Sequence, residues 1–360
     1  MTMIKKMAAV LAAILLVSLL SVSVGASAAD DKLRYGKDML RQMPNSQALI
    51  YVYDVLVTEC NDAKSTNISI ENSQHRISTN ELETVYQIFR NDYPEYFWLP
   101  TEYQCQLDST NTYVSKIIFK YIIRKSISED KKAVESKANA YIQKVQGKLD
   151  FDKSHILHDL LIENITYDKT TTANNQDIYS AFVNGRAVCA GYAKAYEYLL
   201  HKVGIRAFSV TGQSAAPGSG QLEPHEWTMA LLDGHWYCTD VTWDDQNKEL
   251  FHAYLNITVE QLIDDHPVIR FEKYLPKTDS KEDNYFTKNQ HKFSTLDINL
   301  VINDLKTQNG HSEIYYDGKL ANMPTILNSL ATELSTKLAS VNRNFCTCDF
   351  TILGKEIHIQ

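Results

Sequence analysis

The sequence predicts an α+β fold. Segments with apolar side chains at helical spacing alternate with short runs rich in β-branched and aromatic residues, a mixture typical of helices packed on an antiparallel sheet. Asp233-Gly234 lies between two such runs and is the signal of a two-residue β-hairpin turn. With 360 residues, 44% of them hydrophobic, the chain can form a sizeable core and more than one domain.

Composition excludes several other classes. The 13 glycines and 8 prolines are too few for collagen-like or low-complexity chains. Six cysteines are too few for a small disulfide scaffold. Lysine and arginine number 36 against 44 acidic residues, a formal charge of −8. Because there is no basic excess to bind a phosphate backbone, we expect no nucleic-acid partner.

Residues 1–29 have the features of a signal peptide. Lys5 and Lys6 form a positive start, residues 7–24 are almost wholly apolar, and Ala26-Ser27-Ala28 supplies a small-x-small cleavage site. An uncleaved membrane anchor is the alternative, since the apolar run approaches spanning length. We predict a secreted or cell-wall-associated protein with no stable membrane insertion after cleavage.

Residues 30–147 are predicted to form a small N-terminal α+β region. Ser78 and Glu81 have the spacing of a capping box at a helix start. Residues 113–123 indicate a strand, and residues 128–145 indicate a helix capped by Ser128. Cys60 and Cys105 in this region are candidates for one disulfide.

Two further regions follow. Residues 148–286 are predicted to form a second domain, which contains the candidate residues for chemistry, with a helix that begins near Cys189 and stops at Gly204. Residues 287–360 are predicted to form a C-terminal α/β region with one helix over 324–341. Cys346-x-Cys348 supplies too few ligands for a metal site. We expect neither a metal nor a cofactor in the protein.

Cys189 is the first candidate for chemistry. It falls where a loop enters a helix, and the unpaired N–H groups and positive dipole end there favour a thiolate. Its small neighbours Ala187, Ala190 and Gly191 leave room for a substrate carbonyl beside the sulfur. A buried, inert cysteine on an apolar helix is the alternative interpretation.

The hairpin predicts a partner pair for that cysteine. A two-residue turn at Asp233-Gly234 places Trp227 opposite Asp240 and His225 opposite Thr242. His225 and Asp240 then share one face of the ribbon as diagonal neighbours. A carboxylate in that position can hold an imidazole in one tautomer. A solvated pair without function is the alternative.

Three motifs are similar to those of the transglutaminase-like core domain of bacterial secreted proteins. The order Cys, His, Asp fits that family, with separations of about 36 and 15 residues. The resemblance covers about residues 154–286, because two downstream motifs also fit. The matching stretches are Ala187-Val188-Cys189-Ala190-Gly191-Tyr192-Ala193, His225-x-Trp227, Asp240-Val241-Thr242-Trp243-Asp244-Asp245, Tyr254-Leu255-Asn256 and Asp265-His266-Pro267.

The resemblance implies a papain-like fold, in which the helix bearing the cysteine packs on an antiparallel sheet bearing the histidine and the aspartate. It implies Cys189 as nucleophile, His225 as base and Asp240 as the group that orients His225. Glu226 and Thr228 depart from the Ala and Asn that the family often has beside this tryptophan. The departures leave the triad intact but put the substrate groove in question.

Three aromatic residues within these motifs are assigned to substrate binding: Tyr192, Trp227 and Trp243.

The sequence therefore predicts a cysteine-dependent enzyme that acts on peptide or protein amides through a thioester. Hydrolysis is slightly favoured over transfer to a lysine-like amine, because water needs no second binding site. Transfer would make the protein a cross-linking enzyme. A non-catalytic module that binds cell-wall or surface protein is the rival from another class, although such a module has no physical need for all three triad residues.

Overall fold

In a computed structural model, the structure describes residues 32–170, 175–215, 220–246, 249–289, 292–293, 312–316, 323–341, 350–353 and 356–359. The predicted signal peptide and Cys346-x-Cys348 lie outside these residues. Within them, no helix combines the length and the apolar character needed to cross a bilayer.

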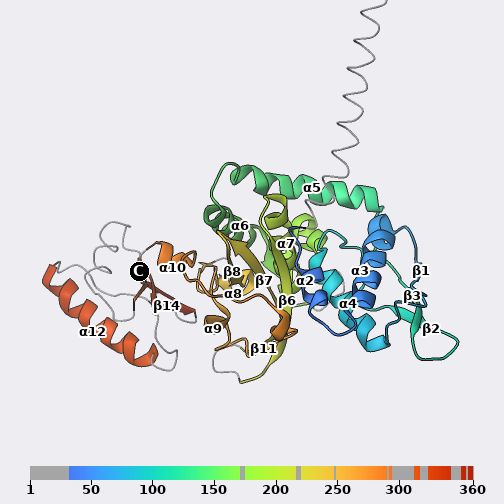
Figure 1. Cartoon of the computed structure of the whole chain (residues 1–360). Coiled ribbons are helices and arrows are strands. Elements are labelled where there is room, and N and C mark those ends of the chain that lie inside the picture. Colours follow the sequence, from blue (N-terminus) through green and yellow to red (C-terminus); the bar gives the residue numbers. More distant parts are fainter. Residues whose placement is uncertain are drawn as a thin grey trace, which may run out of the picture.

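The centre of the molecule is a four-stranded antiparallel sheet in the order β11-β6-β7-β8. Helix α7 packs against β6 and β7, and α6 packs in turn on α7 (Figure 1). The elements of this part are α5 (Ile127–Lys144), α6 (Asp150–Asn164), α7 (Cys189–Lys202), β6 (Ala207–Ser214), β7 (Glu223–Leu232), β8 (His235–Thr239) and β11 (Val268–Ile269).

The predicted hairpin is confirmed over most of its length. Asp233 and Gly234 both have positive φ, 46° and 90°, as a type I′ turn requires. The β7–β8 register runs from Leu232 opposite His235 to Thr228 opposite Thr239. The strand pairing ends at Thr239, one residue before the predicted pair of Trp227 with Asp240.

The two faces of the sheet have different cores. Ala230 and Leu232 of β7 pack with α5, α6 and α7. The alternate residues Trp227 and Met229 pack with the N-terminal helices, since successive strand residues point to opposite faces. The N-terminal elements are α2 (Gly36–Arg41), α3 (Ser46–Cys60), η1 (Asn61–Ala63), β1 (Asn67–Ser69), α4 (Thr79–Asp92), β2 (Gln104–Leu107) and β3 (Val114–Ile118).

The N-terminal predictions hold in part. Helix α4 begins after Ser78 with the predicted capping box to Glu81. The predicted strand over residues 113–123 is too long, because β3 ends at Ile118. Helix α5 begins at Ile127, and Ser126 rather than the predicted Ser128 caps it by accepting from the Glu129 N–H. Glu129 lies three residues after Ser126, which is the capping-box spacing, whereas Lys131 lies three residues after Ser128, so the local pattern favours the observed start.

The predicted disulfide is wrong: Cys60 is a buried free thiol at the end of α3, and Cys105 is an exposed free thiol on β2.

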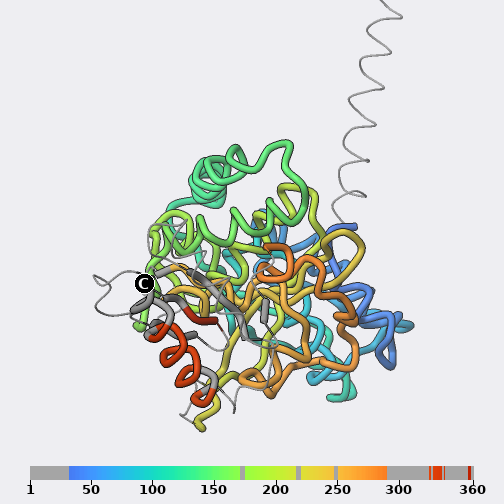
Figure 2. Tube along the Cα trace, turned by 90° about the vertical axis from the view of Figure 1, so that its left-hand side faces the viewer, coloured from blue at the N-terminus to red at the C-terminus, as the bar shows by residue number. Residues whose placement is uncertain are grey.

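The remaining elements are the short helices and strands around the site, together with the elements of the C-terminal part. In Figure 1, α12 and β14 lie on the opposite side of the molecule from α3 and β1, and Figure 2 gives the view turned by 90°. These elements are β4 (Thr166–Tyr167), η2 (Ser180–Asn184), β5 (Arg186–Ala187), α8 (Val241–Asp244), β9 (Asp245–Gln246), β10 (Glu249–Leu250), α9 (Val259–Leu262), η3 (Glu272–Tyr274), α10 (Tyr285–Lys288), β12 (Lys292–Phe293), β13 (Ser312–Tyr316), α12 (Met323–Val341), β14 (Phe350–Leu353) and β15 (Glu356–Ile359).

Candidate active site

Cys189 is the first residue of α7, as the sequence predicts. The N-cap residue Val188 is extended and gives no side-chain cap, so the first turn keeps N–H groups that no side chain caps. Cys189 is half-buried. A side chain at Gly191 would place its Cβ 2.5 Å from the Cβ of Ala187, so only glycine lets β5 lie this close to the start of the helix.

His225 and Asp240 meet in the buried centre of the site. His225 lies on β7, and its Nε2 is 2.5 Å from Oδ2 of Asp240. Asp240 follows β8 and caps α8, where its Oδ1 accepts from the backbone N–H groups of Thr242 and Trp243. The predicted strand pairing of Asp240 with Trp227 is therefore wrong, because the backbone turns into α8 at this residue. The contact between His225 and Asp240 forms nevertheless.

The two side chains shift one another's proton affinity. Burial by itself lowers the pKa of His225, but the charge of Asp240 and the hydrogen bonds to Asp240 and to Cys189 raise that pKa to about 10. Burial would raise the pKa of Asp240, yet the charge and hydrogen bond of His225, with the hydrogen bond of His266, hold it below its usual range. Since Nε2 of His225 is bound to Asp240, Nδ1 is the nitrogen left to meet the Cys189 thiol.

A second histidine reaches the same carboxylate. Nε2 of His266 is 3.0 Å from Oδ2 of Asp240, and its Nδ1 is 2.6 Å from Oδ1 of Asp265. The hydroxyl of Tyr254 donates to the other oxygen of Asp265 at 2.6 Å. No role for His266 is predicted from the sequence, although Asp265-His266-Pro267 is one of the motifs that fit the family.

The three aromatic residues assigned to substrate binding lie in different surroundings. Tyr192 is fully buried, and its hydroxyl donates to Asp245 at 2.6 Å. Trp227 is 1% exposed and its ring lies beside that of His225. Trp243 is half-buried, with its ring centroid 4.5 Å from that of His266. Of the three, only Trp243 has appreciable exposed surface.

Tyr167 is a residue near the site that sequence reasoning missed. It lies on β4 opposite Ala187 of β5 and is 40% exposed. Burial of part of the ring, together with the negative charges of Cys189 and Asp240, raises the pKa of Tyr167 to about 12. Ala187 comes two residues before Cys189, so the strand pairing places Tyr167 near the start of α7. No local pattern marks Tyr167, since its position depends on the pairing of two short strands.

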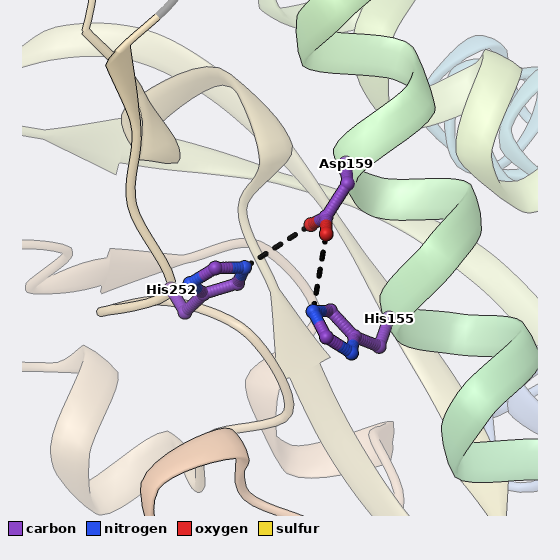
Figure 3. Close-up of side chains that lie close together, drawn as sticks. All are labelled: His155, Asp159 and His252. Carbon is purple, nitrogen blue, oxygen red and sulfur yellow. Dashed lines mark hydrogen bonds and ion pairs between the residues drawn. The ribbon is translucent and has the colours of Figure 1, made fainter. Parts of the chain in front are cut away.

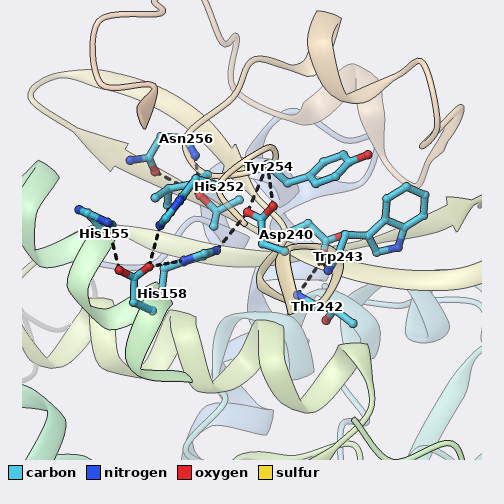
Figure 4. Close-up of polar contacts among 12 residues, drawn as sticks. His155, His158, Asp240, Thr242, Trp243, His252, Tyr254 and Asn256 are labelled. Carbon is cyan, nitrogen blue, oxygen red and sulfur yellow. Dashed lines mark hydrogen bonds and ion pairs between the residues drawn. The ribbon is translucent and has the colours of Figure 1, made fainter. Parts of the chain in front are cut away.

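Two groups among the described residues could hold a metal ion: His225, Asp240 and His266, and His155, Asp159 and His252. In the first group, all three side chains are buried in the contacts already described. The second group lies on α6 and the segment after β10. Figure 4 shows His155, His158 and His252 at one end of the polar contacts, and Thr242 and Trp243 at the other.

The part of the chain that carries Cys189, His225 and Asp240 is similar to a known superfamily. Residues 125–241 match the model of the transglutaminase-like superfamily. No curated protein matches the chain.

Solved structures also match, at low identity. A candidate cysteine protease from Cytophaga hutchinsonii is 18% identical, with 30% of this chain and 37% of that one covered and a TM-score of 0.27. A TGase is 14% identical, with 40% and 44% covered and a TM-score of 0.28. The periplasmic domain of TgpA from Pseudomonas aeruginosa is 16% identical, with 41% and 68% covered and a TM-score of 0.24. The chain thus spans less than half the length of the first two.

The family match includes Cys189, His225 and Asp240. It begins two residues before α5 and ends after the hairpin, so it covers α5, α6 and α7 and the strands β6, β7 and β8, which position these three residues. This part of the chain is a transglutaminase-like domain. The predicted resemblance and the predicted α+β fold of helices on an antiparallel sheet are confirmed.

Proposed function

We propose that the protein is a cysteine-dependent enzyme that acts on amide bonds of peptides or proteins through a thioester. In this proposal Cys189 is the nucleophile, His225 the acid and base, and Asp240 the group that orients His225. The observation that carries it is the 2.5 Å contact of His225 with Asp240 together with the hydrogen bond of His225 with Cys189. A thiol, an imidazole and a carboxylate in this order are the parts that acyl transfer to sulfur needs.

The reaction follows from these contacts. The Cys189 thiolate attacks the amide carbonyl carbon, and the N–H groups of the first turn of α7 can donate to the resulting oxyanion. The His225 imidazolium gives its proton to the leaving nitrogen as the C–N bond breaks, which leaves a thioester. His225 then takes a proton from water or an amine, which attacks the thioester and restores the thiolate.

Hydrolysis is the favoured second step, because water needs no binding site of its own. Transfer to a lysine-like amine differs only in the nucleophile that reaches the thioester. For substrate contact we propose Trp243 and Tyr167, which combine exposed ring surface with closeness to the triad. The buried Tyr192 and Trp227 would act by supporting the positions of α7 and His225.

The proposed substrates are peptides or proteins outside the cytoplasm. This rests on the predicted signal peptide in residues 1–29. Export would bring the enzyme to cell-wall or cell-surface proteins.

The test is mass spectrometry of model peptides incubated with the protein and a primary amine, with Cys189→Ser as the matched control. Cleaved peptides would identify a peptidase. Loss of ammonia with gain of the amine would identify transfer, and a gain of about one mass unit would identify deamidation. If no peptide changes and a thiol-directed amide warhead fails to label Cys189, the protein is a binding module and the proposal is wrong.

A further inference from the structure

Asp159 of α6 is contacted by three histidines. Its Oδ2 is 3.1 Å from Nε2 of His155, one helical turn earlier on α6. Its Oδ1 is 3.1 Å from Nε2 of His252 and 2.9 Å from Nδ1 of His158. Figure 3 shows the rings of His155 and His252 with their nitrogens directed at the carboxylate from two different elements.

Histidines are the ion-pair partners of the Asp159 carboxylate in the described part of the chain. The Asp159 side chain is 21% exposed, so this carboxylate is largely held away from water. A carboxylate in such a position is stabilised by a compensating positive charge. A cation bound at Asp159 would supply that charge.

We propose that His155, Asp159 and His252 form a binding site for a zinc-type divalent cation. Two imidazole nitrogens and one carboxylate suit zinc and its neighbours, whereas calcium and magnesium prefer oxygen ligands alone. A tetrahedral ion about 2.0–2.1 Å from each donor sets the donors about 3.3 Å apart. The nitrogen–oxygen separations of 3.1 Å at His155 and His252 are close to that value.

The solvent exposure of the ligands and the contacts that orient their rings are consistent with a metal site. The side chain of His155 is 26% exposed and that of Asp159 is 21% exposed, so an ion can enter and water can complete the coordination. The ring of Tyr285 stacks on His252 with centroids 3.8 Å apart and fixes its orientation. His158 is fully buried and bonds to the Asp159 carboxylate, as partners behind metal ligands commonly do.

A metal ion in this site would connect α6 to the segment after β10 and, through His158, to α8. His252 belongs to the segment that follows β10, and His158 connects Asp159 to Asp244 at 3.1 Å. Asp244 is the last residue of α8, the short helix that Asp240 caps at its other end. Metal binding would therefore join α6 to the segments that carry the Asp240 carboxylate, and its role would be structural.

The test is zinc binding measured by competition with a chromophoric chelator. The parent is Cys189→Ser, because a thiolate beside His225 could itself bind zinc. We expect one zinc per chain in this parent, and binding at least about tenfold weaker after His155→Ala or His252→Ala. His235→Ala is the control, since the His235 side chain at the start of β8 is 42% exposed and its ion pair is with Asp279, outside this cluster.

Any of three results would overturn the site. The first is the absence of saturable zinc binding in the parent, and the second is binding by His155→Ala equal to that of the parent. The third concerns cobalt(II) in place of zinc. Cobalt(II) spectra separate this site from the cysteines, because ligation by nitrogen and oxygen gives no thiolate-to-cobalt charge-transfer band. A bound cobalt ion that shows the band would also contradict the proposal. If His252→Ala fails to fold, His155→Ala decides the matter, since His155 is partly exposed. None of these binding measurements depends on amide chemistry, so the zinc site and the proposed function can fail separately.

Discussion

The domain contains two carboxylates that are each surrounded by imidazoles. Asp240 lies between His225 and His266, and Asp159 is contacted by three histidines. In each cluster one histidine bridges two carboxylates: His266 joins Asp240 to Asp265, and His158 joins Asp159 to Asp244. The residue types are the same, but among the described residues only the first cluster has a thiol beside it, that of Cys189.

The two clusters differ in the pKa shifts of the groups at their bridges and in their exposure to solvent, and these differences match different functions. Burial lowers the pKa of His266, but its hydrogen bonds to Asp240 and Asp265 raise that pKa overall. At the other bridge, burial raises the pKa of Asp244 well above its usual range. The first cluster is sealed and keeps its charges, as an acid–base site needs. The second is open on one side, as a cation site needs. The two clusters therefore differ in their placement beside a nucleophile rather than in their residue types.

The largest difference between the clusters should appear on Asp240→Asn. An amide in place of this carboxylate would face two imidazoles with an N–H₂ group and favour the wrong tautomer of His225. We expect kcat to fall on the order of 10⁴-fold with the circular dichroism spectrum unchanged. Steady-state kinetics on the substrate found by mass spectrometry measures this. A variant as active as the parent would remove Asp240 from the site.

The matching change in the other cluster, Asp159→Asn, should act on stability instead. It removes the charge that three histidines contact, so we expect a loss of about 1–3 kcal/mol in the free energy of unfolding. The triad contacts remain, and kcat should stay close to that of the parent. Urea denaturation monitored by fluorescence tests the first part. A loss of activity as large as that of Asp240→Asn would show that the two clusters are one functional unit.

His266→Gln should have a smaller effect on catalysis. Glutamine can still donate one hydrogen bond to Asp240 but brings no positive charge, so we expect kcat to fall about tenfold, or about 1.4 kcal/mol. KM should not change, because His266 is fully buried and would not touch substrate. Separate values of kcat and KM, with His235→Gln as control, measure this. An increase in KM at constant kcat would contradict a positioning role.

Asp245→Asn should have the smallest effect. The asparagine carbonyl can still accept the hydrogen bond from Tyr192, so stability should change by less than about 0.5 kcal/mol. Asp245→Ala removes the acceptor from a buried hydroxyl and should cost about 1–3 kcal/mol. Thermal unfolding of the two variants compares them. Equal losses in both would show that the charge of Asp245, and not its bond to Tyr192, is what matters.

The sequence predicts local features of the site well. The hairpin register follows from Asp233-Gly234, because a two-residue turn leaves no freedom in the pairing. The start of α7 near Cys189 follows from apolar side chains at helical spacing after it, among them Tyr192, Tyr196 and Leu199. The prediction fails at Asp240, where side-chain capping of α8 replaces strand pairing. Both strand extension and helix capping suit an aspartate, and the sequence does not rank them.

Contacts between distant segments could not be predicted. His266 is 26 residues from Asp240, and its approach depends on how the chain returns past β8. His155 and Asp159 have the i, i+4 spacing that places them on one helix face. Their third partner, His252, is 93 residues from Asp159, and only the packing of α6 against the segment after β10 brings it near.

The central claim is that Cys189 is an activated nucleophile, and alkylation by iodoacetamide over a pH series tests it most directly. Burial raises the pKa of Cys60 and of Cys238 to about 12, so these thiols serve as unreactive internal controls. Exposed Cys105 serves as the ordinary thiol. We predict that Cys189 labels fastest of these four near about pH 6, and that His225→Ala slows its labelling without changing secondary structure. Labelling of Cys189 only above about pH 8, or only after unfolding, would contradict the account.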